Sequence, residues 1–97
     1  MGEGPSLTVI SSYFPTTCWV FPTAGISDGI IVRFSEGFYL KIYYSDKMHD
    51  AYNVIGGWNG EVNPRLNITV KDKDIKEWCS KITSSEAFMK VVYENRH

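Results

Sequence analysis

The hydrophobic pattern of this chain changes period once, close to residue 72, and that change limits the folds available to it. Between residues 7 and 70, short runs rich in β-branched and aromatic residues follow one another, as expected for β-strands. Beyond residue 72, apolar residues recur at the spacing of one helix face: Ile75, Trp78, Cys79 and Ile82. The chain therefore predicts an α+β fold, an antiparallel sheet of four to six short strands at residues 7–70 followed by one or two helices at residues 73–95 packed on one face. A small curled barrel plugged by the C-terminal helices is the alternative.

The clearest local prediction is a β-hairpin over residues 30–44, with its turn at Ser35-Glu36-Gly37. Alternation along the two strands directs one set of side chains toward the core: Ile30, Val32, Phe34, Phe38, Leu40, Ile42 and Tyr44. The other set mixes aromatic and basic side chains on the opposite face: Ile31, Arg33, Tyr39, Lys41 and Tyr43. One face of the hairpin is thus predicted to be core and the other a mixed surface.

Two further short strands are predicted before this hairpin, at residues 7–14 and 16–21, separated by Pro15; the alternative is one strand interrupted by a bend. Residues 23–29 are expected to form a loop that ends in an Asp28-Gly29 turn.

A second hairpin is predicted after the first, over residues 52–62, because Asn59-Gly60 suits a two-residue type I′ turn. Gly56 and Gly57 indicate a bulge or the close approach of another backbone. Pro64 is expected to end that run, which leaves residues 66–70 as the last strand.

The first predicted helix begins with Asp72 as its N-cap. Residues 83–86, Thr-Ser-Ser-Glu, have the spacing of a capping box, which would start a second helix with Phe88, Val91 and Val92 on its buried side. The alternative is one long helix over residues 73–95. The run of Thr and Ser favours the break, because these side chains compete for backbone hydrogen bonds inside a helix.

Size and charge set the limits on function. The 97 residues are expected to form a single domain, with residues 1–5 disordered. A net charge of −1 gives none of the positive field that drives non-specific nucleic-acid binding. The sequence contains no secretory signal and no stretch that approaches a membrane span, so we expect a cytoplasmic protein that does not enter the membrane. Cys18 and Cys79 form no Cys-x-x-Cys motif, so two buried thiols are predicted, with no metal and no cofactor. The alternative is a disulfide between them, which would require export of the protein.

No catalytic motif stands out, and an enzyme is the third of three hypotheses. His49 is the only internal histidine, so a small hydrolase would depend on it as general base. Cys18 with His49 would be the corresponding nucleophile pair, but nothing in the sequence near Cys18 lowers the pKa of its thiol. We therefore assign no catalytic residues.

The first half of the chain favours protein binding. Residues 13–44 contain nine aromatic residues and four charged ones, a composition typical of an interface as well as of a core. We expect a small non-enzymatic protein-binding module, of the inhibitor, immunity or viral accessory type, that self-associates as a homodimer or contacts another protein. The predicted binding residues are Arg33, Tyr39, Lys41, Tyr43, Trp58 and Asn59. The alternative function is binding of a nucleotide or single-stranded nucleic acid through the same residues, with bases stacked on the rings.

Overall fold

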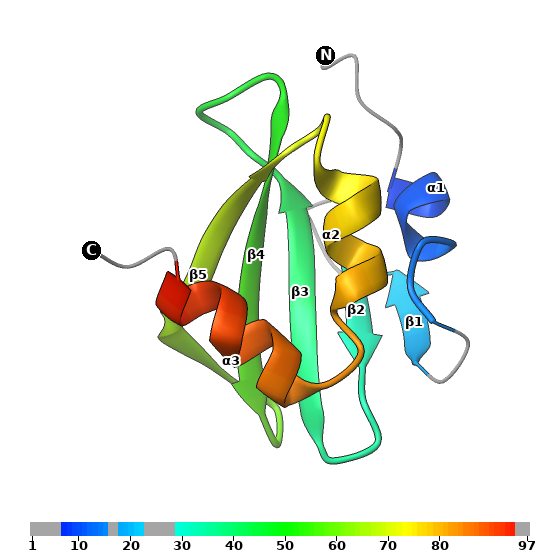
Figure 1. Ribbon diagram of the computed structural model, residues 1–97, viewed down its shortest axis with the longest axis vertical. Helices are drawn as coiled ribbons and strands as arrows, with labels where there is room; N and C mark the ends of the chain where they lie inside the picture. The colour runs from blue at the N-terminus through cyan, green and yellow to red at the C-terminus, as the bar shows by residue number, and fades with distance from the viewer. Residues whose placement is uncertain (1–6, 16–17, 23–28, 95–97) are drawn as a thin grey trace.

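A five-stranded antiparallel sheet forms the centre of the protein, in a computed structural model that describes residues 7–15, 18–22 and 29–94. The strands follow one another in space in chain order: β1 Trp19–Pro22, β2 Gly29–Arg33, β3 Phe38–Tyr44, β4 Ala51–Trp58 and β5 Glu61–Lys71. The helices of the described residues are α1 Leu7–Ser11, α2 Ile75–Lys81 and α3 Ser85–Glu94 (Figure 1). The α+β prediction is confirmed. The sheet is open, with β1 and β5 at its edges, and is not the closed barrel of the alternative.

The helices bury their apolar side chains against one face of the sheet. Leu7 and Ile10 of α1, Ile75 and Cys79 of α2 and Phe88 of α3 belong to a single core cluster with the inward residues of the strands. In Figure 1, α2 and α3 lie in front of the sheet, on the same side of it. We call the opposite face the outer face. Strand pairing and alternation place these residues on it: Trp19, Phe21, Ile31, Arg33, Tyr39, Lys41, Tyr43, Asn53, Ile55, Val62, Asn67 and Thr69.

Both predicted hairpin turns are confirmed. Gly37 adopts φ 83° in the turn between β2 and β3, where Phe34 N–H donates to the Phe38 carbonyl at 2.9 Å. Asn59 and Gly60 have φ values of 54° and 87°, the left-handed conformations that a type I′ turn requires. The Asn59 N–H also donates to the Gly37 carbonyl at 3.3 Å, which ties the two turns together at one end of the sheet.

Pro64 does not end a strand, and that prediction was wrong. β5 continues through it, because β5 is an edge strand and a proline at an edge or bulge removes no ladder hydrogen bond. The pairing shifts here, since Val62 pairs with Gly57 while Asn67 pairs with Ile55. The bulge predicted at Gly56 and Gly57 is therefore confirmed.

Residues 7–14 form helix α1 and a following turn, not the predicted strand. Leu7, Ile10 and Phe14 fall at i, i+3 and i+7, and all three are buried in the core cluster. Burial of this stripe overrides the β propensity of the segment's branched residues. The predicted strand at residues 16–21 is confirmed from Trp19 onward as β1. Residues 16–17, the loop with its Asp28-Gly29 turn up to residue 28, and the expected disorder of residues 1–5 lie outside the described residues.

The C-terminal part contains two helices, as the sequence favoured. The N-cap of α2 is Asp74 and not Asp72, so the predicted cap was wrong by two residues. Asp72 instead extends the sheet, because its N–H donates to the Asp50 carbonyl at 2.7 Å. The Ser84 hydroxyl accepts from the Ala87 N–H at 3.2 Å and begins α3, one residue later than the capping box predicted. Phe88 and Val92 are buried as expected, and Val91 is half-buried.

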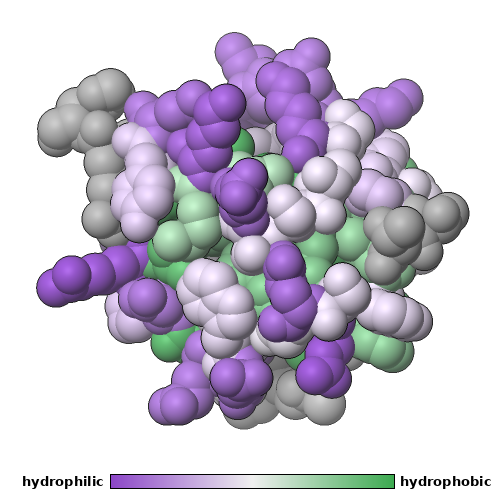
Figure 2. Space-filling view, turned by 60° about the horizontal axis from the view of Figure 1, so that its bottom comes forward, coloured by the Kyte–Doolittle hydropathy of each residue, from purple (hydrophilic) through white to green (hydrophobic). Residues whose placement is uncertain are grey.

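The turn between β2 and β3 also holds the start of α3. The Ser85 N–H donates to Glu36 Oε1 at 2.7 Å, so the carboxylate occupies a free amide at the helix N-terminus. In Figure 2, the end of the molecule that lies at the bottom of Figure 1 is turned forward, and hydrophilic side chains surround a central apolar area.

Acid is expected to weaken this junction. The Ser85 hydroxyl and then its N–H stabilise charged Glu36 and lower the pKa of the carboxyl below its ordinary 4.5. A carboxyl with a lowered folded-state pKa stabilises the protein above the unfolded pKa, and this contribution is lost as pH falls through the folded pKa. Thermal unfolding should show Glu36→Gln melting below wild type at pH 7, with a smaller difference at pH 3. The control Glu61→Gln, an exposed carboxylate on β5, should match wild type at both pH values. An equal difference at both pH values for Glu36→Gln would contradict this role of the charge.

Candidate binding face

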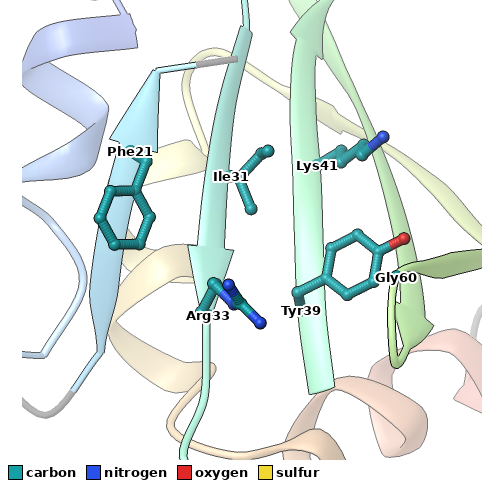
Figure 3. A pocket seen from close by; sticks show the side chains of 6 residues that line it. All are labelled: Phe21, Ile31, Arg33, Tyr39, Lys41 and Gly60. Atoms are coloured by element: carbon teal, nitrogen blue, oxygen red, sulfur yellow. The ribbon is translucent and has the colours of Figure 1, made fainter. Parts of the chain in front are cut away.

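The outer face contains a hollow of about 470 Å³, which we call the outer-face hollow. Its lining comes from β1, β2, β3 and the turn after β4: Phe21, Ile31, Arg33, Tyr39, Lys41 and Gly60 (Figure 3). A second hollow of about 380 Å³ adjoins it and shares Phe21 and Arg33 with it. The volume of the outer-face hollow is within the range of small-ligand and side-chain pockets.

Tyr39 is the buried residue of this site. It is 6% exposed, yet it is not part of the core cluster, because it lies on the other side of the sheet. Its hydroxyl is buried and has no hydrogen-bond partner among the described residues. Figure 3 shows the ring between Arg33 and Gly60. A buried hydroxyl without a hydrogen-bond partner costs about 1 to 3 kcal/mol, so this group lowers the stability of the folded protein.

Two cations lie beside Tyr39. Arg33 is exposed and pairs across the strands with Tyr39, whereas Lys41 is half-buried and pairs with Ile31. The Lys41 Nζ lies 6.0 Å from the centroid of the Tyr39 ring, the outer limit of a cation–π contact. Neither cation forms an ion pair with a described residue. The described ion pairs are elsewhere, between Lys71 and Asp50 and between Lys81 and Glu77, at 3.5 Å each.

The structure brings together four of the six predicted binding residues and separates the other two. Arg33, Tyr39, Lys41 and Tyr43 share the outer face, with Tyr43 beside Gly29, where a Cβ atom would lie 2.6 Å from the Tyr43 ring. Trp58 is on the helix side, half-buried, with its ring 4.7 Å from that of Phe38. Asn59 lies in the turn after β4, next to Gly60, but is not itself a lining residue of the hollow. Trp58 was grouped with the others because its glycine neighbours suggested a loop tip, but it continues β4 and alternates inward.

Sequence reasoning missed the two most exposed aromatic residues of this face. Trp19 is 56% exposed and Phe21 47% exposed, and β1 pairs them with Arg33 and Ile31. Their alternation in residues 19–21 contained the signal, but a strand of four residues cannot be assigned a face until its neighbour is known. Val62, 39% exposed, adds a further apolar side chain on β5.

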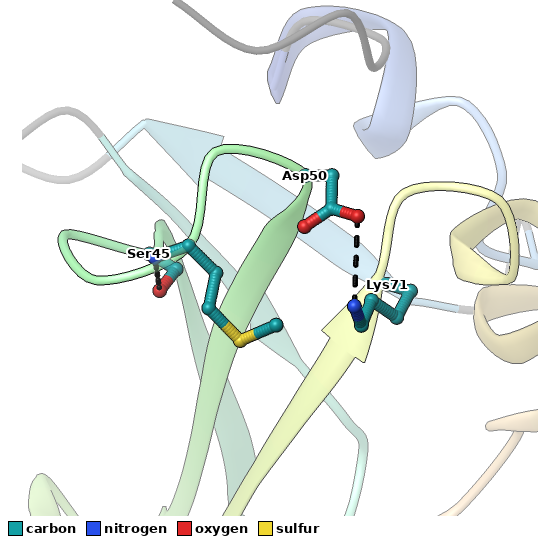
Figure 4. Close-up of polar contacts among 4 residues, drawn as sticks. Ser45, Asp50 and Lys71 are labelled. Atoms are coloured by element: carbon teal, nitrogen blue, oxygen red, sulfur yellow. Dashed lines mark hydrogen bonds and ion pairs between the residues drawn. The ribbon is translucent and has the colours of Figure 1, made fainter.

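His49 and Cys18, the hypothetical catalytic pair, lie at opposite ends of the sheet. Cys18 precedes β1 at the end where Trp19 pairs with Arg33, and His49 is exposed in the loop beyond the other end of β3. That loop is held by local polar contacts (Figure 4). The Ser45 hydroxyl accepts from the N–H groups of Lys47 and Met48, and Asp50 pairs with Lys71.

The thiols are expected to differ strongly in reactivity. Cys79 is fully buried, and burial raises its pKa to about 12, so at pH 8 almost none of it is thiolate. Cys18 is half-buried, which corrects the prediction of two buried thiols. Iodoacetamide should therefore alkylate Cys18 in the native protein about 100-fold or more faster than Cys79, which should react only after unfolding in urea. Peptide mass mapping at timed intervals measures both rates. Equal rates in the native protein would show that α2 does not shield its cysteine.

Among the described residues, no group of three or more His, Cys, Asp or Glu side chains is arranged to hold a metal ion. Within the same residues, the helices are all too short or too polar to cross a bilayer. Comparison of the chain with models of known families, with characterised proteins and with solved structures finds no match.

Proposed function

We propose that this protein is a small non-enzymatic binding module that contacts a protein partner through the outer face of its sheet. The single observation that carries the proposal is the difference between the two faces. The helices cover one face, whereas the other presents Trp19 and Phe21 about half exposed beside the outer-face hollow. Aromatic side chains that are exposed to solvent and do not contribute to the core are typical of interaction surfaces.

The composition of this face supports a protein partner. Protein interfaces are enriched in Trp, Tyr, Phe and Arg at their centres, and residues of this kind contribute most of the binding energy. Trp19, Phe21, Tyr39 and Arg33 lie on three neighbouring strands, so they form one continuous surface. A strand is also a rigid support, which reduces the entropy lost on binding.

Binding of a nucleotide or single-stranded nucleic acid is the second candidate function. It is favoured by one observation, that Arg33 and Lys41 share a sheet face with Tyr39 and Tyr43, as in proteins that stack bases on an open sheet. The position of Trp58 on the helix side removes one of the three stacking rings that the sequence suggested. Protein binding is therefore the better supported function.

We also propose the cytoplasm as the compartment, as the sequence suggested. Cys79 is a buried thiol, and thiols persist in a reducing compartment. A small domain that binds by one face suits the roles of an inhibitor, an immunity factor or a viral accessory protein, and we propose this type of role.

The test compares capture of partners by three forms of the protein. Wild type, the double variant Trp19→Ser/Phe21→Ser, and the control Tyr93→Ser are immobilised and exposed to extract of the native host. Tyr93 is the matched control, because it is a 59% exposed aromatic residue on α3. We expect a specific protein retained by wild type and by the control but lost from the double variant, with circular dichroism unchanged in all three.

Self-association is measured on the same three proteins by sedimentation. A dimer of wild type and of Tyr93→Ser that dissociates in the double variant would identify a second copy as the partner. If the double variant retains the same partner and the same oligomeric state as wild type, the outer face is not the binding surface and the proposal fails.

A further inference from the structure

We propose that the outer-face hollow receives an acidic side chain of the partner protein, whose carboxylate is bound by Arg33 and Lys41. The apolar part of the same partner segment would pack against Phe21 and Ile31, which line the hollow on its β1 and β2 side. This inference rests on the proposed function and names the chemistry of the partner. It specifies an Asp or Glu beside an aromatic or aliphatic residue.

The two cations can reach a common ligand. Arg33 is paired with Tyr39 and Lys41 with Ile31, so the cations are diagonal neighbours on adjacent strands. Such neighbours are about 7 to 8 Å apart, with their Cβ atoms somewhat closer, a distance that two long side chains can span to meet one carboxylate. Both line the same hollow, and neither is neutralised by an ion pair within the described residues. A carboxylate bound in the hollow would neutralise these two cations.

Tyr39 offers a second, independent indication of a ligand. Its side chain is more than nine-tenths buried, and its hydroxyl lacks an acceptor and a donor among the described residues. An oxygen of a bound carboxylate, after small shifts of the side chains around the hydroxyl, would supply the missing acceptor. A hydroxyl that serves only the fold would be expected to find its partner within the protein.

Charge favours an acidic protein over the other partners considered. None of the outward positions described on the five strands carries a carboxylate, and Asp50, just before β4, is already paired with Lys71. A second copy docked face to face would therefore bring Arg33 and Lys41 of both copies together without a free acid to pair them. A nucleic acid would find two cations on a chain whose net charge is −1, whereas strong phosphate binding needs many neutralising contacts. One carboxylate is what two cations can hold.

Selection from a displayed library of random heptapeptides tests the inference on the full chain. We expect the enriched peptides to share an Asp or Glu next to an aromatic or aliphatic residue. The best peptide is then synthesised with a fluorescein label, and its affinity is measured by fluorescence anisotropy. Its affinity should be lost with Trp19→Ser/Phe21→Ser and kept with Tyr93→Ser.

A double-mutant cycle isolates the contact between the acid and the cations. Arg33→Gln should weaken binding about tenfold, and replacement of the peptide's acid by its amide should weaken it at least as much, because the amide also loses its contact with Lys41. The two changes together should cost no more than the peptide change alone, because the amide has already lost its contact with Arg33. The control Lys90→Gln, at an exposed lysine of α3, should bind as wild type does.

Tyr39→Phe separates a binding role from a structural one. Because the substitution removes a hydroxyl that has no partner in the free protein, it should leave the melting temperature unchanged or raised. It should also lower the affinity for the peptide several-fold. A lowered melting temperature with unchanged affinity would assign the hydroxyl to the fold and remove it from the site.

The outcomes that overturn this inference differ from those that overturn protein binding. The carboxylate site would be refuted if the enriched peptides lack acids, or if Arg33→Gln leaves the affinity of the best peptide unchanged. The outer face would then remain as an apolar interface. A ten-residue oligothymidylate that displaces the peptide at physiological salt, together with additive effects of Arg33→Gln and the peptide change, would mean that the site binds phosphate and not a carboxylate. Peptides that bind Trp19→Ser/Phe21→Ser as they bind wild type would refute the proposed function itself.

Discussion

Phe38→Ala is expected to lower the free energy of unfolding by about 3 to 5 kcal/mol, the largest effect of any single truncation in this chain. Phe38 is fully buried and lies where β3, β4 and α3 meet. Its ring centroid is 4.7 Å from that of Trp58, 5.5 Å from that of Phe34 and 5.6 Å from that of Phe88. Removal of the ring would leave a cavity that three further aromatic rings cannot fill without moving, so both the transfer and the cavity cost apply.

Urea unfolding followed by circular dichroism measures this loss. A domain of this size is stable by about 5 to 10 kcal/mol, so Phe38→Ala should be marginal at 25 °C. The control is Phe21→Ala, which removes the same ring from the outer face, where it is 47% exposed. We expect that change to cost about 1 kcal/mol or less. Equal losses for the two variants would mean that Phe21 belongs to a core and is not available to a partner.

Gly57→Ala is expected to be the second most damaging change, with a loss of about 3 kcal/mol or more. A Cβ atom at Gly57 would collide with the Glu61 carbonyl oxygen and would lie 2.7 Å from the Val62 Cα atom. Both atoms belong to the backbone of β5, so no side-chain rotation can relieve the contact. The β4 and β5 strands would have to separate at the bulge.

Gly60→Ala provides the comparison. Gly60 has φ 87°, so alanine there is strained, but a Cβ atom would meet nothing within 4 Å. Its cost should be about 1 to 2 kcal/mol, the strain of a left-handed conformation without a steric clash. If urea unfolding shows Gly60→Ala to be the more harmful change, the close approach of β5 to Gly57 is not what requires glycine.

Local patterns predicted the parts of the fold that depend on neighbouring residues. The two hairpins were predictable because each has a turn that needs positive φ, Gly37 in one and Asn59-Gly60 in the other. The two C-terminal helices were predictable from apolar spacing. Asp72 failed as a cap because its backbone pairs with Asp50, which is distant in sequence and joins it only in the folded sheet.

Contacts distant in sequence decided the rest. The segment that begins at Leu7 forms a helix because β2 and α2 accept its apolar stripe, although its residues favour a strand in isolation. Pro64 is tolerated because β5 has a strand on one side only. The face of Trp58 follows from a pairing with Phe38 that no local signal contains.

The same limits apply to the candidate site. Arg33, Tyr39, Lys41 and Tyr43 were predictable as one face, because alternation within a hairpin needs no further information. Trp19 and Phe21 were not predicted to join them, since only the pairing of β1 with β2 places these aromatic residues beside the basic ones. The missing partner of the Tyr39 hydroxyl is a property of the folded environment and has no counterpart in the sequence.

The indole N–H signals of the three tryptophans test the central claim most directly, because each indole reports on a different region. Trp19 lies on the outer face, Trp58 packs on Phe38 at the helix side, and Trp78 is buried in the core cluster. Two-dimensional nitrogen–proton spectra are recorded while the selected peptide or the captured partner is added. We predict that the Trp19 signal shifts or broadens while those of Trp58 and Trp78 stay in place. A shift of Trp58 with Trp19 unchanged would place the partner on the helix side and contradict a binding function for the outer face.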